Sequence, residues 1–289
     1  MKIQKILLLY KKSAYKIHFL ENEVIKIRKI DIIQNQIKQF KEAHSLHYQT
    51  LKVVTRILSD SGVELTKCCR GHEINYNKYD LIVTVGGDGT FLEAARNCYK
   101  HQIILGVNSA PTYSIGRFCI CDMTNFGSLI QSVLGGHFFI NYLQRIRLKF
   151  NHIHKTFDAL NDALICHTNP AMLCRYYMAL RDQLEEHRSS GMWVATASGS
   201  SGAIKSAGGK KLDRDSKKFQ YLPRELYTLN NIRYRLKGGI LKAEEQIKIT
   251  SLMNKGMVYI DGAHWYIPFY YGTSLKISLS PNPIKTVKF

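Results

Sequence analysis

Residues 80–92 read DLIVTVGGDGTFL, and this stretch decides the fold of the first part of the chain. The apolar run that ends at Val85 predicts a buried strand, and helical spacing begins at Phe91 in FLEAARNCY (91–99). Three glycines, one aspartate and one threonine separate the two elements. A glycine-rich turn between a strand and a helix collects free backbone N–H groups and the positive end of the helix dipole, so the stretch predicts a phosphate site.

The segments on either side continue the alternation of strand and helix. Residues 2–10 (KIQKILLLY) read as a strand, and from 31 to 59 apolar residues recur every three or four positions, as in a helix with one buried face. Gly62 supplies a helix stop, VELTKC (63–68) begins another strand, and QIILGVN (102–108) reads as a further one. This succession predicts an α/β domain with a parallel, Rossmann-like sheet.

The pattern changes near residue 140. Apolar and basic residues alternate from 145 to 150 (RIRLKF), which predicts a half-exposed antiparallel strand. Similar short runs follow toward the end of the chain, separated by turn residues: DALICHT, YYMALRDQ, GMWVATA, EQIKITSL, GMVYIDG and SLKISLS. They predict a second domain, a mainly antiparallel all-β sandwich, with the boundary between 130 and 142.

The composition is that of a folded protein. Its 289 residues are 45% hydrophobic, and no apolar run has the length of a membrane span or a signal peptide. Seven cysteines without a regular framework are typical of reduced thiols, so we expect a cytoplasmic protein. His44 and His47 lack a third candidate ligand nearby, so we expect core or interface histidines. The net charge of +19 is scattered and no nucleic-acid-binding motif accompanies it, which favours a generally basic surface.

The glycine loop differs from two familiar phosphate loops. A P-loop needs a lysine after its last glycine, where Thr90 stands here, and the dinucleotide fingerprint needs a third glycine, where Leu92 stands. We expect the glycines because side chains would block a close approach to phosphate and because tight turns need positive φ. Asp88 is unusual in an anion site. It binds a divalent cation, accepts a proton or does both, unless it only caps the following helix.

A second stretch of small residues, GMWVATASGSSGAIKSAGGKK (191–211), repeats this pattern in the predicted sandwich. Hydroxyls and glycines from Thr196 to Gly202 leave room for a flat ligand and can bond its polar edges. Residues 203–207 predict one or two helical turns that end at Gly208, and the lysines nearby could neutralise phosphates. Alternatively, the stretch is a surface turn rich in serine and glycine.

In order and spacing these blocks resemble the NAD kinase family: GGDGTFL, then GVNSAPTYSIGRFC, then ALND, then SSGMWVATASGSSGAIKSAGG. The likeness is closest to the branch of mitochondrial-type and related bacterial NAD kinases, and it extends from HSLHYQTLKVV to VYIDGAH. The resemblance implies an α/β domain (1–138) with the GGDGT loop, a β-sandwich (139–270) with the NAD-binding segment, and a last segment (271–289) that returns to the first domain.

The resemblance also implies an activity, which is transfer of the ATP γ-phosphate, with Mg²⁺, to the 2′-OH of the adenosine ribose of NAD. Asp88 would be the catalytic carboxylate that orients or deprotonates this hydroxyl. NAD would contact Gly89, Asn161, Asp162, Arg188, Ser190, Ser201, Gly202, Ala203 and Ser206, and phosphate would contact Gly86, Gly87, Thr90 and Lys205. Family members imply a homodimer or homotetramer. The donor (ATP, another nucleotide or polyphosphate) and the choice between NAD and NADH stay open.

Three positions depart from the family pattern. Ser190 replaces an aspartate found in many members, Ala203 replaces an aromatic residue, and Asp162 is shorter than the usual glutamate. These differences could change the affinity for the dinucleotide or the preference between NAD and NADH. Two other interpretations stay open. One is a lipid kinase of the diacylglycerol or sphingosine type, which shares the GGDGT loop, and the other is a catalytically weak regulator that binds NAD or nucleic acid.

Overall fold

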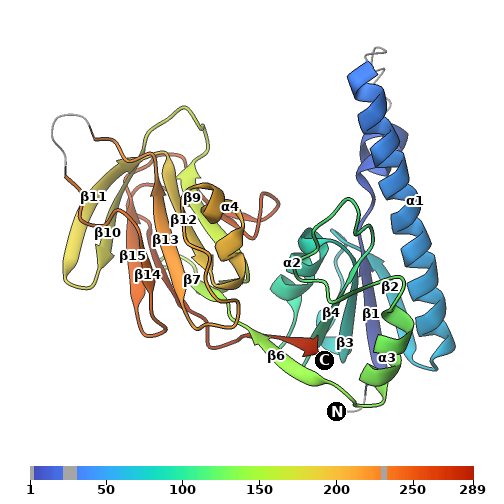
Figure 1. Cartoon of the computed structure of the whole chain (residues 1–289). Helices are drawn as coiled ribbons and strands as arrows, with labels where there is room; N and C mark the ends of the chain where they lie inside the picture. The colour runs from blue at the N-terminus through green and yellow to red at the C-terminus, as the bar shows by residue number, and fades with distance from the viewer. Residues whose placement is uncertain (1–2, 22–30, 229–232) are drawn as a thin grey trace. The chain divides into compact units, whose positions relative to one another are not determined.

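The structure, a computed structural model, describes residues 3–21, 31–228 and 233–289 (Figure 1). It divides the chain into two compact units, one of Met1–Asn141 with Lys285–Phe289 and one of Tyr142–Ile284. The first is the α/β domain expected from the sequence, and the second is the β-sandwich. No helix within the described ranges is both long and apolar enough to cross a bilayer.

The first unit is built on a seven-stranded sheet in the order β2-β1-β3-β4-β19-β6, with β5 beside β4. β1 pairs in parallel with β2 and β3, and β4 pairs in parallel with β3, β5 and β19, which confirms the predicted parallel sheet. β3 and β4 are buried along their whole length because helices cover both faces. The strands are β1 (Lys5–Tyr10), β2 (Glu64–Cys69), β3 (Leu81–Gly86), β4 (Ile103–Asn108), β5 (Cys121–Asp122), β6 (Phe139–Leu143) and β19 (Ile284–Lys288).

In the described part of the first unit, three α-helices flank this sheet. α1 (Asp31–Asp60) and α3 (Phe126–Leu134) lie on one face, and α2 (Asp88–Asn97) lies on the other (Figure 1). Two short helices, η1 (Lys16–Leu20) and η2 (Tyr76–Lys78), lie in the connections. Gly62, just beyond α1, has φ +73°, which fits its predicted role as a helix stop.

Among the side chains of α1 that the structure describes, from residue 35 on, the apolar face is buried only in the second half of the helix. Leu51, Val54 and Leu58 pack into the core, whereas Phe40, which belongs to the same predicted face, is 38% exposed. A helix of 30 residues is roughly 45 Å long, about twice the length of the six-residue strands it covers. The first half of α1 therefore runs past the end of the sheet (Figure 1).

The second unit consists of two six-stranded antiparallel sheets that share one apolar core. One has the order β11-β10-β15-β18-β7-β8 and the other the order β14-β13-β12-β9-β16-β17. Their bounds are β7 (Ile146–Phe150), β8 (Phe157–Ala159), β9 (Asp162–His167), β10 (Cys174–Leu180), β11 (Gln183–Ser189), β12 (Gly191–Thr196), β13 (Phe219–Arg224), β14 (Gly239–Leu241), β15 (Gln246–Ser251), β16 (Gly256–Ile260), β17 (Tyr266–Pro268) and β18 (Ser274–Leu279), with short helices η3 (Ser198–Ser201) and α4 (Ala203–Ser206).

The alternation predicted for residues 145–150 is confirmed within β7, whereas Arg145, just before the strand, is buried. Ile146, Leu148 and Phe150 are buried, and the residues between them are more exposed. The sequence did not predict β8, β11, β13, β14 and β17. In β13 the misleading residue is Pro223, which argues against a central strand. It is accommodated because β14 pairs only with residues 219–221 of β13 and leaves position 223 without a partner on that side.

The segment that returns to the first unit is shorter than expected. Residues 271–289 were expected to return, but β18 pairs with β15 and β7 inside the sandwich, and the first unit resumes only at Lys285. Leu275 and Ile277 are fully buried in the sandwich core, which explains why this stretch stays there. The first boundary lies between residues 141 and 142, three residues beyond the expected 138.

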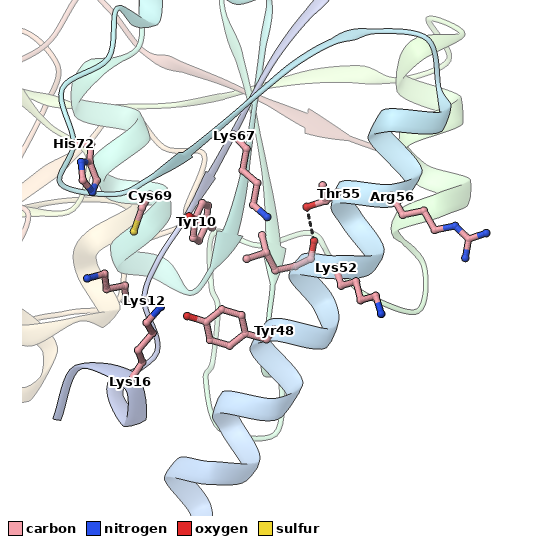
Figure 2. A pocket seen from close by; sticks show the side chains of 11 residues that line it. Tyr10, Lys12, Lys16, Tyr48, Lys52, Thr55, Arg56, Lys67, Cys69 and His72 are labelled. Carbon is pink, nitrogen blue, oxygen red and sulfur yellow. Dashed lines mark hydrogen bonds between the residues drawn. The ribbon is translucent and has the colours of Figure 1, made fainter. Parts of the chain in front are cut away.

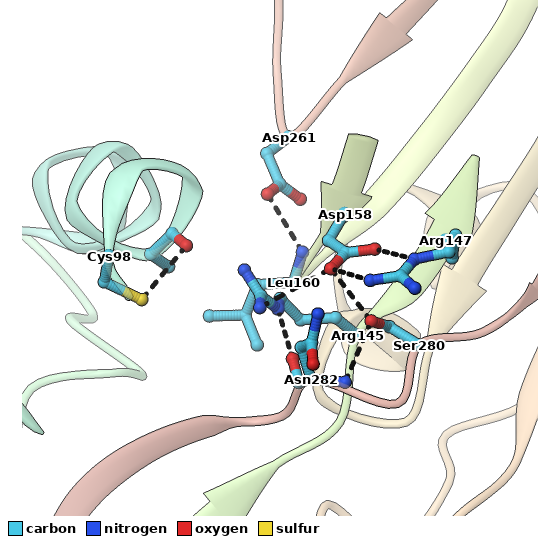
Figure 3. A network of polar contacts seen from close by, with 9 residues as sticks. Cys98, Arg145, Arg147, Asp158, Leu160, Asp261, Ser280 and Asn282 are labelled. Atoms are coloured by element: carbon cyan, nitrogen blue, oxygen red, sulfur yellow. Dashed lines mark hydrogen bonds and ion pairs between the residues drawn. The ribbon is translucent and has the colours of Figure 1, made fainter. Parts of the chain in front are cut away.

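Ion pairs around Asp158 join the strand that enters the second unit to the segment that leaves it (Figure 3). Arg147 of β7 binds Asp158 through Nε and Nη2, at 2.8 and 2.9 Å, and Arg145 lies 3.5 Å from the same carboxylate. After β18, Ser280 Oγ donates to Asp158 at 2.8 Å, and the carbonyl of Asn282 accepts from Arg145 Nε at 2.7 Å. Because Asp158 and Arg145 are nearly buried, removing either side chain would leave the other charge buried without its partner, which costs more than the loss of an exposed pair.

Candidate active site

The GGDGT loop forms the junction between β3 and α2. β3 ends at Gly86, Gly87 is the N-cap residue, and α2 begins at Asp88, three residues earlier than predicted. The amides of residues 88 and 89 lie in the first turn, where N–H groups have no acceptor within the helix. The loop therefore has the N–H donors and the positive dipole end that a phosphate requires.

One of the two reasons expected for glycine in this loop is wrong, and packing supplies another. None of Gly86, Gly87 and Gly89 has positive φ, so the expectation of a left-handed turn is wrong. A Cβ added at Gly86 would lie 2.2 Å from Thr90 Oγ1, and one added at Gly87 would lie 2.6 Å from Ser114 Oγ. These glycines are required because neighbouring side chains pack directly on the main chain.

Asp88 does not cap α2. The N-cap position belongs to Gly87, and no side chain caps the helix there, so the capping interpretation is wrong. Instead Asp88 Oδ1 accepts a hydrogen bond of 2.9 Å from the backbone N–H of Phe118. This bond ties the carboxylate to the GVNSAPTYSIGRFC loop, which follows β4. Asp88 is partly exposed and its Oδ2 has no hydrogen bond to the described residues, so this oxygen is available to a ligand.

Two cations beside the loop were missed by the sequence reasoning. Arg70 follows β2, and its Nη1 lies 3.2 Å from the place a Cβ would take at Gly89, while its Nε lies 3.3 Å from Glu93. Lys11 follows β1 and is partly buried, and its pKa is lowered by burial and then by Arg70. Both directly follow parallel strands, whose carboxyl ends meet at one edge, and that signal could have identified them.

In the second unit, the backbone around Asn161 and Asp162 is held by a third residue, Asp261. The carboxylate of Asp261 accepts from the N–H groups of Leu160, Asn161 and Asp162, at 2.9, 2.6 and 3.2 Å, and Figure 3 shows the first of these bonds. Asn161 Nδ2 donates to Asp162 Oδ2 at 2.9 Å. Asp261 has φ +50° and lies in the VYIDGAH block, but no role for it could be deduced from that block alone.

Asp162 is 5% exposed, and its pKa is raised to about 7 by burial and by repulsion from Asp261. Since this pKa lies above the value in the unfolded chain, the folded state binds more protons between about pH 4 and pH 7, and the free energy of unfolding falls as pH rises through that window. Asp162→Asn should remove this penalty and keep an acceptor for Asn161. We expect it to raise the free energy of unfolding, by roughly 2 kcal/mol more at pH 8 than at pH 5.

Urea denaturation of both proteins at pH 5 and pH 8 measures this difference. The matched control is Asp182→Asn, the same substitution at a position in an exposed turn, measured at the same two pH values. If Asp162→Asn changed stability equally at the two pH values, the raised pKa of Asp162 would be contradicted.

The 191–211 stretch lies directly against Asn161. Thr196 Oγ1 donates to the carbonyl of Leu160 at 2.6 Å, and a Cβ added at Gly199 would lie only 1.9 Å from the carbonyl oxygen of Asn161. A Cβ added at Gly202 would lie 3.5 Å from Asn161 Nδ2. The structure therefore brings Asn161, Asp162 and the small residues of this stretch together in the second unit.

Not all hydroxyls of this stretch are free for a ligand. Thr196 and Ser200 bond the protein itself, the latter through the carbonyl of Ala197 and the N–H of Leu212, so they do not serve as expected. Ser201 Oγ is buried without a partner among the described residues, as is Thr90 Oγ1 in the first unit. A buried hydroxyl without a hydrogen bond costs about 1–3 kcal/mol, so these two are candidates for ligand contacts.

The remaining predicted residues divide into two groups. Ala203, Lys205 and Ser206 lie exposed on α4, which ends before Gly208 with φ +102°, as predicted. Arg188 and Ser190 precede β12, at the opposite end of that strand from Ala195, which pairs with Asp162. Four residues of strand span roughly 13 Å, so the structure does not bring Arg188 and Ser190 to the Asn161 group. Arg188 instead bonds Glu186, 3.1 Å away.

His47 is a buried structural residue. Its two ring nitrogens lie 2.8 Å from Ser109 Oγ and 2.8 Å from the carbonyl of Lys11, and burial lowers its pKa to about 4. His44 bonds Ser13 Oγ at 2.6 Å. The prediction of core histidines is confirmed for His47, which links α1 to the ends of β1 and β4.

Comparison with known proteins adds independent evidence. Residues 17–138 match the family model described as the ATP-NAD kinase N-terminal domain. An Arabidopsis thaliana protein named NADH kinase is 30% identical over 99% of this chain and 96% of its own length. NAD kinase 2 of Oceanobacillus iheyensis is 26% identical over 82% of this chain and 87% of its own length. An Archaeoglobus fulgidus NAD kinase, solved in complex with ATP, has the same fold, with a TM-score of 0.70 and 19% identity over 99% of this chain and 94% of that one. Since the similarity to the plant enzyme extends through both units, the chain belongs to the NAD kinase family.

Proposed function

We propose that this protein is an NAD kinase that transfers the γ-phosphate of ATP to the 2′-OH of the adenosine ribose of NAD or NADH. The main support for the proposal is the geometry of Asp88. This carboxylate lies partly exposed at the start of α2, with one oxygen fixed by the Phe118 N–H and the other available to a substrate hydroxyl. Family membership supports it. The lipid kinase alternative has no support from these findings.

The residues of the first unit fit the charge movements of phosphoryl transfer. Since the transition state is loose, catalysis consists mainly of alignment and charge stabilisation. We assign Asp88 Oδ2 to the ribose hydroxyl, whose proton it would orient or accept while Phe118 fixes the carboxylate. The first-turn amides of α2 and the hydroxyl of Thr90 would bind phosphate, and Arg70 and Lys11 would balance its charge.

Magnesium fits this group of residues as a companion of ATP. Mg²⁺ usually keeps several waters and is bound mainly by substrate phosphates, so the negative charge of Asp88 would favour the ion nearby while its Oδ2 stays with the ribose hydroxyl. Bound there with ATP, the ion would neutralise negative charge on the phosphates.

The second unit supplies the groups proposed to bind the dinucleotide. The amide of Asn161, the carboxylate of Asp162 and the hydroxyl of Ser201 would bond its polar edges, and Gly202 would lie against it without a side chain in the way. Lys205 on the exposed face of α4 would meet phosphate. The names of the two relatives, NADH kinase and NAD kinase 2, support both redox forms as candidate acceptors.

A matrix of donors and acceptors tests the proposal. Purified protein is incubated with ATP, another nucleoside triphosphate or inorganic polyphosphate, and with NAD, NADH, diacylglycerol or sphingosine, and each product is separated by chromatography. We expect NADP or NADPH with ATP. Dinucleotide binding without any product would contradict the proposal and support the regulator instead, and a product with lipid alone would support the lipid kinase.

Two further expectations are also proposals. The seven cysteines are free thiols in the structure, which supports the cytoplasm as the location. A homodimer or homotetramer is proposed by analogy with the family. Light scattering of the purified protein measures the subunit count, and fractionation of cells that express it tests the location.

A further inference from the structure

A basic pocket opens in the first unit between α1 and the strands β1 and β2 (Figure 2). Its volume is about 680 Å³, within the range of pockets that hold small molecules. None of its lining residues is among those assigned above to catalysis, phosphate or dinucleotide. The cations that line it are Lys12, Lys16, Lys52, Arg56 and Lys67.

The charge of this pocket is not balanced by its own residues. No carboxylate is among the lining residues. Glu21, which pairs with Lys12 at 2.9 Å and Lys16 at 3.9 Å, and Asp60, which lies 3.7 Å from Arg56, stand outside. Lys52 and Lys67 have no carboxylate within 4.0 Å among the described residues. The pocket therefore holds more cationic side chains than carboxylates. This excess of positive charge attracts a ligand with several negative charges.

Two tyrosines give the pocket flat apolar walls. Tyr10 is the last residue of β1 and Tyr48 belongs to α1, so one ring comes from the sheet and the other from the helix (Figure 2). Lys67 Nζ lies 5.2 Å from the centroid of the Tyr10 ring, and Lys16 Nζ lies 5.9 Å from that of Tyr48. Aromatic rings interleaved with lysines are suited to stack a base while the cations bind its phosphates.

We propose that this pocket binds a nucleotide with two or more phosphates, at a site separate from the GGDGT loop. A simple anion would not use the aromatic walls, and an uncharged ring would not use the five cations. The pocket is lined by residues of α1, β1 and β2 within a volume on the scale of one nucleotide, which favours a single nucleotide over a strand of nucleic acid. The proposal does not depend on the kinase activity.

Photoaffinity labelling with 8-azido-ADP tests the proposal on the full chain. The labelled protein is digested and the label is located by mass spectrometry. We expect label on the α1 peptide that carries Tyr48 and Lys52, and at least a tenfold loss of that label in the Lys52→Ala/Lys67→Ala double variant. The matched control is Lys248→Ala/Lys276→Ala, an exposed pair on β15 and β18 of the sandwich, which removes the same charge and should keep the label. Absence of label from the α1 peptide overturns the proposal.

Competition identifies the ligand chemistry. We expect unlabelled ADP to displace the label at concentrations at least tenfold lower than adenosine or inorganic tripolyphosphate. Equal displacement by tripolyphosphate would overturn the nucleotide assignment in favour of a simple polyanion site, and stronger displacement by an oligothymidylate would overturn it in favour of single-stranded nucleic acid. Tyr48→Leu, which keeps the charge, should weaken ADP and leave tripolyphosphate unchanged. Melting curves of each variant verify that the fold is intact.

Discussion

Asp88→Asn is expected to lower turnover by about 10²–10⁴, the usual effect of losing a general base. The asparagine can still accept the hydrogen bond from the Phe118 N–H, so the loop should keep its structure. What the variant lacks is a negatively charged oxygen that can take or orient a hydroxyl proton. Steady-state kinetics with NAD and ATP measure the effect, and we expect kcat to fall while KM for NAD changes little.

Asp80→Asn is the matched control for this variant. Asp80 precedes β3, at the opposite end of the strand from Asp88, and its Oδ2 accepts from the N–H groups of Gln4 and Lys5 at 2.8 and 2.9 Å. An asparagine oxygen can replace it there, so turnover should stay normal. Near-normal turnover of Asp88→Asn would refute the catalytic assignment, and a large drop in its melting temperature would point to a structural role.

The sequence predicted the elements whose signals are local. The apolar run before Gly86, the alternation around Leu148 and the helix stop at Gly62 each depend on neighbours within a few residues, and all three are present. The strand β11 was missed because its residues, QLEEHRS, are mostly polar. Local patterns carry no information on such a strand, which is held by pairing with β10 along its whole length.

The parts of the site that escaped prediction depend on contacts between distant segments. Asp261 binds N–H groups about 100 positions earlier in the chain, and Arg70 reaches Gly89 only because β2, β1 and β3 are neighbours in the sheet. The glycines of the GGDGT loop were predicted correctly as a feature, but of the two reasons given for them the positive φ is wrong, and the packing of side chains on them was not foreseen. The side chains that pack on them, such as Ser114, come from another loop.

Gly199→Ala is expected to have the second large effect. The added Cβ would lie 1.9 Å from the carbonyl oxygen of Asn161, 2.5 Å from its carbon and 2.9 Å from its Cα, all of them backbone atoms that cannot rotate away. The chain at Asn161 must therefore move, although the Thr196 N–H and the Asp261 carboxylate hold it in place. We expect the free energy of unfolding to fall by roughly 2–4 kcal/mol, in the range of severe overpacking.

The same displacement should weaken dinucleotide binding, because it moves Asn161 and Asp162, the groups proposed to hold NAD. Calorimetric titration with NAD is expected to show at least a tenfold rise in Kd, which corresponds to about 1.4 kcal/mol. Gly127→Ala on α3 is the control, since its Cβ would meet Ile57 Cδ1 at an ordinary 3.6 Å and alanine favours a helix. If Gly199→Ala melted normally and bound NAD normally, the close contact between residues 199 and 161 would be wrong. If it were destabilised but kept its affinity for NAD, Asn161 and Asp162 would not be the residues that hold the dinucleotide, because their backbone cannot stay in place beside an alanine.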